Sequence, residues 1–128
     1  MSTAIFLITH EGIASSLLSI GKSIIQKPID NISFMEVPMD AEVDLITKSI
    51  ETKINTLNLN DGIIFITDIY GSTPANIAKQ FATQHATSLL SGINLPMIIR
   101  LLSYRDENSQ TLLKKALDGA CQGIHINN

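Results

Sequence analysis

Short continuous apolar runs alternate along the chain with stretches in which apolar residues recur every three or four positions. The first pattern is typical of buried strands and the second of helices packed on a sheet. The sequence therefore predicts alternating strands and helices. The predicted strands cover residues 4–8, 32–37, 63–67, 88–91 and 123–126.

The predicted helices lie between these strands, and signals for their ends are present. Asp40 is a suitable N-cap for the second helix, and Thr73 is a suitable N-cap for the third, with Pro74 following it. A short apolar helix follows Pro96, and a last helix begins near Ser109. The residues predicted to face inward are Ile13, Leu17, Ile20 and Ile24 in the first helix, and Leu113, Ala116, Leu117 and Ala120 in the last.

This alternation predicts a single α/β domain over residues 1–128. We expect a doubly wound, mainly parallel sheet of order 2-1-3-4 with helices on both faces. Residues 123–126 are predicted to add an antiparallel edge strand at the C-terminal end. In the order 2-1-3-4 the first and third strands are neighbours, so the loops after them meet at the switch point where such folds place their chemistry.

Composition narrows the class of protein. The chain has 128 residues, 45% hydrophobic and 16% charged, with a net charge of −3, which fits one folded domain and argues against nucleic-acid binding. The lone Cys121 has no partner for a disulfide and is predicted to be a small core residue. No Cys/His cluster indicates a metal site or a cofactor. No segment approaches the roughly 20 apolar residues of a membrane span, so we expect a cytoplasmic protein without membrane insertion.

Two loops carry the candidate chemistry. His10 follows the first predicted strand, and Asp68 follows the third. A neutral imidazole is a nucleophile if one ring nitrogen is free and the other is held by a partner, and Asp68 is the predicted partner of His10. Gly71, Ser72 and Thr73 then open a helix whose free N–H groups favour an anion, with the hydroxyls of Ser72, Thr73 and Thr9 as additional donors.

Each of these features alone has an ordinary structural explanation. A histidine at a strand end, a helix that begins Gly-Ser-Thr-Pro, and an aspartate in a turn are all common in folded proteins. Their predicted meeting at adjacent strand ends favours function. Sites of other classes lack their motifs, since the chain has no GxGxxG, no GxxxxGK[ST] and no GxSxG.

Three segments together resemble the mannose-type enzyme IIA domain of the bacterial phosphoenolpyruvate:sugar phosphotransferase system. They are Ile8-Thr9-His10, Thr67 to Pro74, and Gly92 to Met97. The resemblance extends over nearly the whole chain in matching order and spacing. It implies that His10 accepts a phosphoryl group from the carrier HPr and passes it to a histidine of a IIB component, in sugar uptake or its regulation.

The resemblance also implies roles for other residues. Asp68 would orient His10, Thr73 and the loop N–H groups would contact the phosphoryl group, and Asn94 would brace the site. Family members are homodimers that exchange the terminal strand, which Gly123 to Ile126 matches by position.

Two departures from the family pattern are Ser72, where a second glycine is usual, and Glu11, where a glycine is frequent. Serine is unfavourable if the backbone there needs a positive φ, and Glu11 adds negative charge beside an incoming phosphoryl group. Two alternatives stay open. One is the phosphotransfer subunit of a phosphoenolpyruvate-dependent dihydroxyacetone kinase, and the other is a regulatory module that is phosphorylated without onward transfer.

Overall fold

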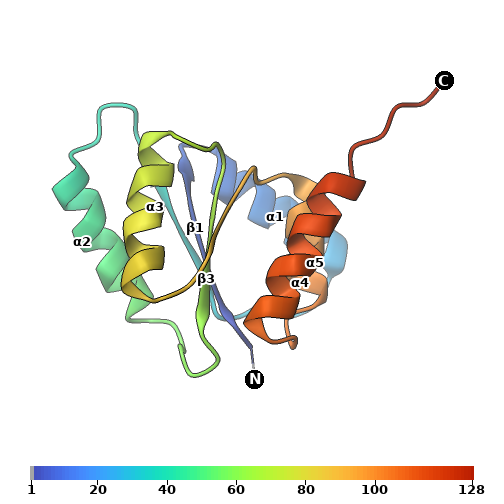
Figure 1. The fold of residues 1–128 in the computed structure, drawn as a ribbon, viewed down its shortest axis with the longest axis horizontal. Helices are drawn as coiled ribbons and strands as arrows, with labels where there is room; N and C mark the ends of the chain where they lie inside the picture. The colour runs from blue at the N-terminus through green and yellow to red at the C-terminus, as the bar shows by residue number, and fades with distance from the viewer. Residues whose placement is uncertain (1) are drawn as a thin grey trace.

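The structure, a computed structural model, describes residues 2–128 and shows strands and helices in alternation (Figure 1). The strands are β1 (Ala4–His10), β2 (Ile32–Val37), β3 (Ile63–Thr67) and β4 (Leu89–Ser91). The helices are α1 (Ile13–Ile25), α2 (Val43–Ile54), α3 (Thr73–Gln84), α4 (Leu95–Ser103) and α5 (Ser109–Gln122).

The four strands form one parallel sheet of order β2-β1-β3-β4, which confirms the predicted order. The register places Ile8 beside Thr67 on β3 and His10 beside Val37 on β2. The carboxyl ends of β1 and β3 therefore meet at the switch point, as the sequence predicts.

Helices cover both faces of the sheet, and each face has its own core. In Figure 1, α2 and α3 lie on one side of the sheet and α1, α4 and α5 on the other. Side chains alternate along a strand, so neighbouring β1 residues enter different cores. Phe6 and Ile8 pack with α2 and α3, whereas Ile5 and Leu7 pack with α1, α4 and α5.

Two predicted helix starts are wrong, one by two residues and the other by one. The second helix begins at Val43, and its N-cap is Glu42, which makes no side-chain capping bond, so Asp40 does not cap it. The third helix is capped by Ser72, whose hydroxyl accepts the N–H of Ala75, so Thr73 is already its first helical residue. Pro74 stays in the first turn, where its missing N–H is tolerated.

The buried side of α1 differs from the predicted one, since only Leu17 of the four predicted residues packs against the core. The exposed fractions are 37% for Ile13, 47% for Ile20 and 55% for Ile24. The helix instead buries Ala14, Leu18 and Gly21. A β-carbon at Gly21 would lie only 2.6 Å from Cγ2 of Ile98, so the small residue allows α1 and α4 to approach closely. Large apolar residues dominate a periodicity count, so such a count does not detect the small residues of the true interface.

The C-terminal end corrects three further predictions. Residues 124–128 form no strand, so the antiparallel edge strand is absent from this chain by itself. Ile124 and Ile126 are 75% and 87% exposed, and Figure 1 shows this segment leading away from the body of the molecule. On α5, Leu117 is exposed and Leu112 is buried, and the predicted core residue Cys121 is exposed as well.

Candidate functional site

His10 and Asp68 are in direct contact at the carboxyl edge of the sheet. Nδ1 of His10 lies 2.7 Å from Oδ2 of Asp68, and the backbone N–H of His10 donates to the same oxygen at 3.0 Å. Because an ionised carboxylate only accepts hydrogen bonds, the pair assigns the proton to Nδ1 and leaves Nε2 free. The His10 side chain is 32% exposed, so a reagent can reach it.

The environment keeps Asp68 ionised. Burial raises the pKa of this carboxyl group, but hydrogen bonds from the backbone and the ring of His10 outweigh burial, and the net pKa is lowered. The N–H of Ile69 donates to the other oxygen, Oδ1, at 3.0 Å. A carboxylate held in this way stabilises positive charge on the neighbouring imidazole.

Thr9 is fully buried, on the side of β1 that faces α1. Its hydroxyl donates to the carbonyl oxygen of His10 at 2.8 Å and accepts the N–H of Ala14 at 3.1 Å. Both roles of the hydroxyl are thus occupied within the protein. The geometry gives Thr9 a part in holding the turn after β1, and its contact with a phosphoryl group stays a prediction.

The loop after β3 presents the start of α3 at the same edge. Gly71 has a φ of +81°, a conformation that favours glycine, whereas Ser72 has a φ of −85°. Serine at position 72 is therefore unstrained, and its hydroxyl caps the helix and donates to the carbonyl oxygen of Ile69 at 2.8 Å. Thr73 is exposed on the first turn, with its side chain open to solvent.

The loop after β4 braces Asp68 through its backbone. The N–H of Gly92 lies 3.1 Å from the carbonyl oxygens of both Thr67 and Asp68. The side chain of Asn94 makes other contacts. It accepts the N–H of Met97 at 2.9 Å, which caps α4, and it donates to the carbonyl oxygen of Ala120 at 3.2 Å. Neither of these hydrogen bonds reaches His10 or Asp68, so the bracing role of Asn94 stays a prediction.

Sequence reasoning missed one polar contact of this edge. Glu36, near the end of β2, accepts both the N–H and the hydroxyl of Ser15 on Oε2, at 2.9 and 2.7 Å. A charged residue inside an otherwise apolar strand is the signal that points to such a role. The apolar pattern by itself predicts Glu36 only as part of a strand.

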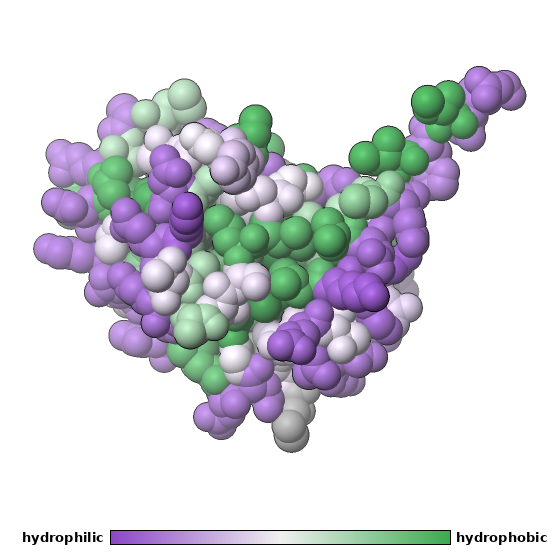
Figure 2. Space-filling model, viewed as in Figure 1, coloured by the Kyte–Doolittle hydropathy of each residue, from purple (hydrophilic) through white to green (hydrophobic). Residues whose placement is uncertain are grey.

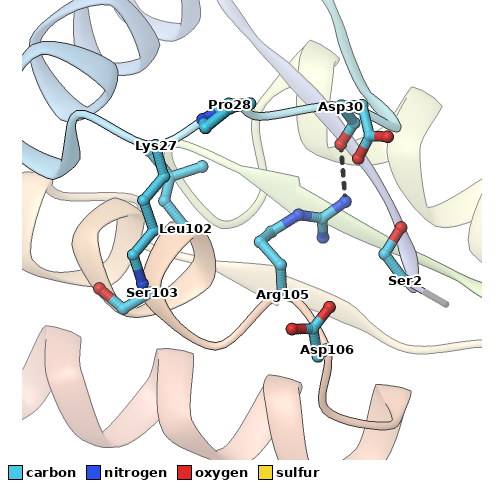
Figure 3. A pocket seen from close by; sticks show the side chains of 8 residues that line it. All are labelled: Ser2, Lys27, Pro28, Asp30, Leu102, Ser103, Arg105 and Asp106. Carbon is cyan, nitrogen blue, oxygen red and sulfur yellow. Dashed lines mark hydrogen bonds between the residues drawn. The ribbon is translucent and has the colours of Figure 1, made fainter.

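A polar cavity of about 280 Å³ lies at the opposite edge of the sheet from His10. Figure 3 shows the side chains that line it. Its centre is Arg105, which donates to the carbonyl oxygens of Thr3 and Asp30. Burial lowers the pKa of Arg105, although Asp30 and Asp106 favour its charged form. The hydrogen bonds of Arg105 connect the amino ends of β1 and β2 to the loop between α4 and α5, and the cavity contributes nothing to the His10 site.

Comparison with known families identifies the chain as a whole. Residues 4–117 match the family described as PTS system fructose IIA component, also called EIIA-man. The chain belongs to this family.

Relatives of this IIA component agree with that assignment. The mannose-specific EIIAB component of Escherichia coli strain K12 is 22% identical over 127 residues, and the match covers 97% of the chain and 39% of that relative. The chain thus spans about two fifths of this relative's length. The fructose-specific EIIA component of Bacillus subtilis is 38% identical over a shorter stretch of 45 residues, or 34% of the chain.

Solved structures of phosphotransferase-system proteins have the same fold. The mannose/sorbose-specific IIA subunit from Enterococcus faecalis superposes with a TM-score of 0.87 at 16% identity and covers 100% of this chain and 96% of its own. A putative phosphotransferase system permease from Klebsiella pneumoniae superposes with a TM-score of 0.78 at 29% identity, covering 98% of this chain and 91% of its own. Within residues 2–128, none of the helices has the length and apolar character needed to span a bilayer.

Proposed function

We propose that this IIA component is a histidine phosphocarrier that takes a phosphoryl group from phospho-HPr onto Nε2 of His10 and passes it to a histidine of a IIB component. The 2.7 Å contact between Nδ1 of His10 and Asp68 carries the proposal. It supplies the two things a nucleophilic imidazole needs, a fixed tautomer and a free second nitrogen.

The bonds formed and broken in the phosphoryl transfer balance without a cofactor. The lone pair on Nε2 attacks the phosphorus of the donor phosphohistidine, a new P–N bond forms on His10, and the P–N bond of the donor breaks. The Nδ1 proton stays in place, and the ring becomes a cation while its phosphoryl group is attached. The carboxylate of Asp68, accepting the Nδ1 hydrogen bond, stabilises that cation. Transfer to the IIB histidine reverses the same steps.

The start of α3 supplies the anion site. Hydrogen bonding among residues 2–128 leaves the backbone N–H groups of Gly71 and Thr73 without an acceptor, and the partial positive charge of the helix end adds to their attraction. The hydroxyl of Thr73 is an additional donor. Neutral donors hold a phosphoryl group less firmly than lysine or arginine, which suits a group that must leave again.

The proposed partners include a second copy of the chain. Figure 2 shows an apolar surface between α3 and α5. Leu89 and Leu90 on the edge strand β4 are half-buried, and Leu117 on α5 is 47% exposed. Ile124 and Ile126 alternate with His125, the pattern of a strand with one apolar side. We propose that residues 123–126 of each protomer add to β4 of the other, which would cover both the free edge and this surface.

The test is phosphorylation in a defined mixture of phosphoenolpyruvate, enzyme I and HPr, followed by intact-protein mass. We expect one acid-labile phosphoryl group on the wild type and none on His10→Ala, with His125→Ala as the matched control that still takes up one. Labelling of His10→Ala at another residue would contradict the proposal. Adding a purified IIB component should then discharge the protein, and retention of the phosphoryl group would favour the regulatory alternative.

A further inference from the structure

Two helices begin beside His10, and the backbone N–H groups at their N-termini differ in hydrogen bonding. α3 has free N–H groups, as described above. α1 is capped by Gly12, which has no side chain to serve the N–H groups of the first turn. Two of these groups, those of Ala14 and Ser15, are nevertheless satisfied by residues outside the helix.

The acceptors come from the two neighbouring strands. Thr9 on β1 accepts the N–H of Ala14, and Glu36 on β2 accepts the N–H of Ser15. Thr9 and Glu36 are paired in the register of the sheet, so both side chains leave the same face, the one that α1 covers. The Ser15 hydroxyl adds a second bond to the same carboxylate oxygen.

The carboxylate of Glu36 is electrostatically suited to its position at the N-terminus of α1. Negative charge is favourable at the N-terminus of a helix. Burial raises the pKa of Glu36, but the hydrogen bonds from Ser15 and Gly12 and the charge of Lys53 outweigh it, so the group stays ionised at neutral pH. Glu36 thus occupies the place at α1 that an external anion would take.

The contact between Glu36 and α1 affects the position of His10, because few residues separate His10 from this helix. Between His10 and α1 lie only Glu11 and Gly12, and Gly12 has a φ of +86°, so the chain turns sharply there. The hydroxyl of Thr9 connects the first turn of α1 to the carbonyl oxygen of His10. Fixing α1 against β2 therefore fixes the backbone from which the His10 ring projects.

We propose that Glu36 is a positioning residue for phosphotransfer: its carboxylate caps α1, holds the turn after His10, and closes this helix end to the phosphoryl group, leaving the start of α3 as the single anion site. The inference rests on the proposed function, because it assigns a role within the same site. Glu36 acts through Ser15 and the turn and does not take part in the bond changes.

The test compares Glu36→Ala, Glu36→Gln and a matched control, Asp40→Ala, which removes an exposed carboxylate from the loop after the same strand. We expect Glu36→Ala to lower the kcat of phosphorylation by phospho-HPr about tenfold or more with KM nearly unchanged, because a misplaced nucleophile affects the reaction and leaves docking intact. Glu36→Gln keeps an acceptor for Ser15 and should recover most of the rate. Asp40→Ala should match the wild type.

A second readout separates this inference from the proposed function. The ¹⁵N resonances of the His10 ring, recorded on the unphosphorylated proteins, should shift in Glu36→Ala and stay near the wild-type values in Asp40→Ala.

If Glu36→Ala does not fold, Ser15→Ala, which removes one of the two bonds to Oε2, takes its place. Wild-type kcat and wild-type His10 resonances in a folded Glu36→Ala protein would overturn the inference, as would a Glu36→Gln protein as slow as Glu36→Ala. A wild type that takes up no phosphoryl group would instead overturn the proposed function, and the resonances would still test Glu36.

Discussion

One carboxylate oxygen of Asp68 holds His10 at two points, with the imidazole Nδ1 at 2.7 Å and the backbone N at 3.0 Å. The two residues are 58 positions apart in the chain. A single contact would fix the tautomer of the ring alone. Two contacts from one oxygen also fix the backbone that carries the ring, so Asp68 determines both the chemical state of His10 and its place at the sheet edge.

Replacing Asp68 should therefore slow phosphorylation strongly. We expect Asp68→Asn to lower the initial rate of phosphoryl uptake from phospho-HPr by about 100-fold, because the amide provides no charge for the imidazole cation and can donate to Nδ1, which favours the wrong tautomer. Radiolabel incorporation measures the rate. Asp61→Asn, at the other end of the same strand, is the matched control. Equal rates for Asp68→Asn and the wild type would remove Asp68 from the mechanism.

The lowered pKa of Asp68 predicts an acid dependence of stability. Its pKa in the folded protein lies below the unfolded value of about 3.9, so the carboxylate stabilises the fold fully above that pH. This contribution is lost as the pH falls further, through the folded pKa. The difference in the free energy of unfolding between the wild type and Asp68→Asn should accordingly narrow below about pH 4. Urea unfolding between about pH 7 and pH 2.5 measures it, and a difference that widens on acidification would contradict the pKa direction.

Ser72 should act as a helix cap whose loss costs stability. Ser72→Ala removes the acceptor for the N–H of Ala75, and we expect the free energy of unfolding to fall by about 1 kcal/mol. Ser72→Gly, which restores the residue usual in the family, should cost only a few tenths of a kcal/mol by the same scale. Urea unfolding distinguishes the two. Equal losses in both variants would show that capping is not the main role of this hydroxyl.

Thr9 offers a way to separate positioning from phosphoryl binding. Thr9→Val keeps the shape of the side chain but removes both hydrogen bonds, leaving the N–H of Ala14 and the carbonyl of His10 buried without this partner. We expect a loss of about 1–3 kcal/mol in the free energy of unfolding. Thr9→Ser keeps the hydroxyl and is the control. A Thr9→Val protein of wild-type stability that still fails to hold the phosphoryl group would instead place the hydroxyl in the anion site.

The oligomeric state should depend on the last few residues. A chain that ends at Gly123 lacks Ile124 and Ile126 and should be a monomer, because the proposed exchanged strand is gone. A chain that ends at Ile126 keeps the strand and should be a dimer, as we expect of the wild type. Light scattering after size-exclusion chromatography measures the mass of each. A dimer that survives truncation at Gly123 would place the contact between copies elsewhere.

Local sequence patterns determined the strands of the sheet and their order. The apolar runs define β1 to β4, and their alternation with helices selects the order β2-β1-β3-β4. That order alone makes His10 and Asp68 neighbours, because the carboxyl ends of β1 and β3 meet at the switch point. The meeting of His10 and Asp68 was therefore available from the sequence before any distance was known.

Tertiary structure decided what depends on the direction of a side chain or on close packing. Side chains alternate along β1, so the Thr9 hydroxyl lies on the face that α1 covers and accepts the N–H of Ala14 there. The neighbouring strand β2 brings Glu36 to the same helix end, where it accepts the N–H of Ser15. The small residue Gly21 fixes the buried side of α1, since a close approach between helices depends on volume more than on hydrophobicity. Residues 123–126 show the same limit, because a strand forms only where it pairs with another strand, and the C-terminal end of this chain leads away from its own sheet.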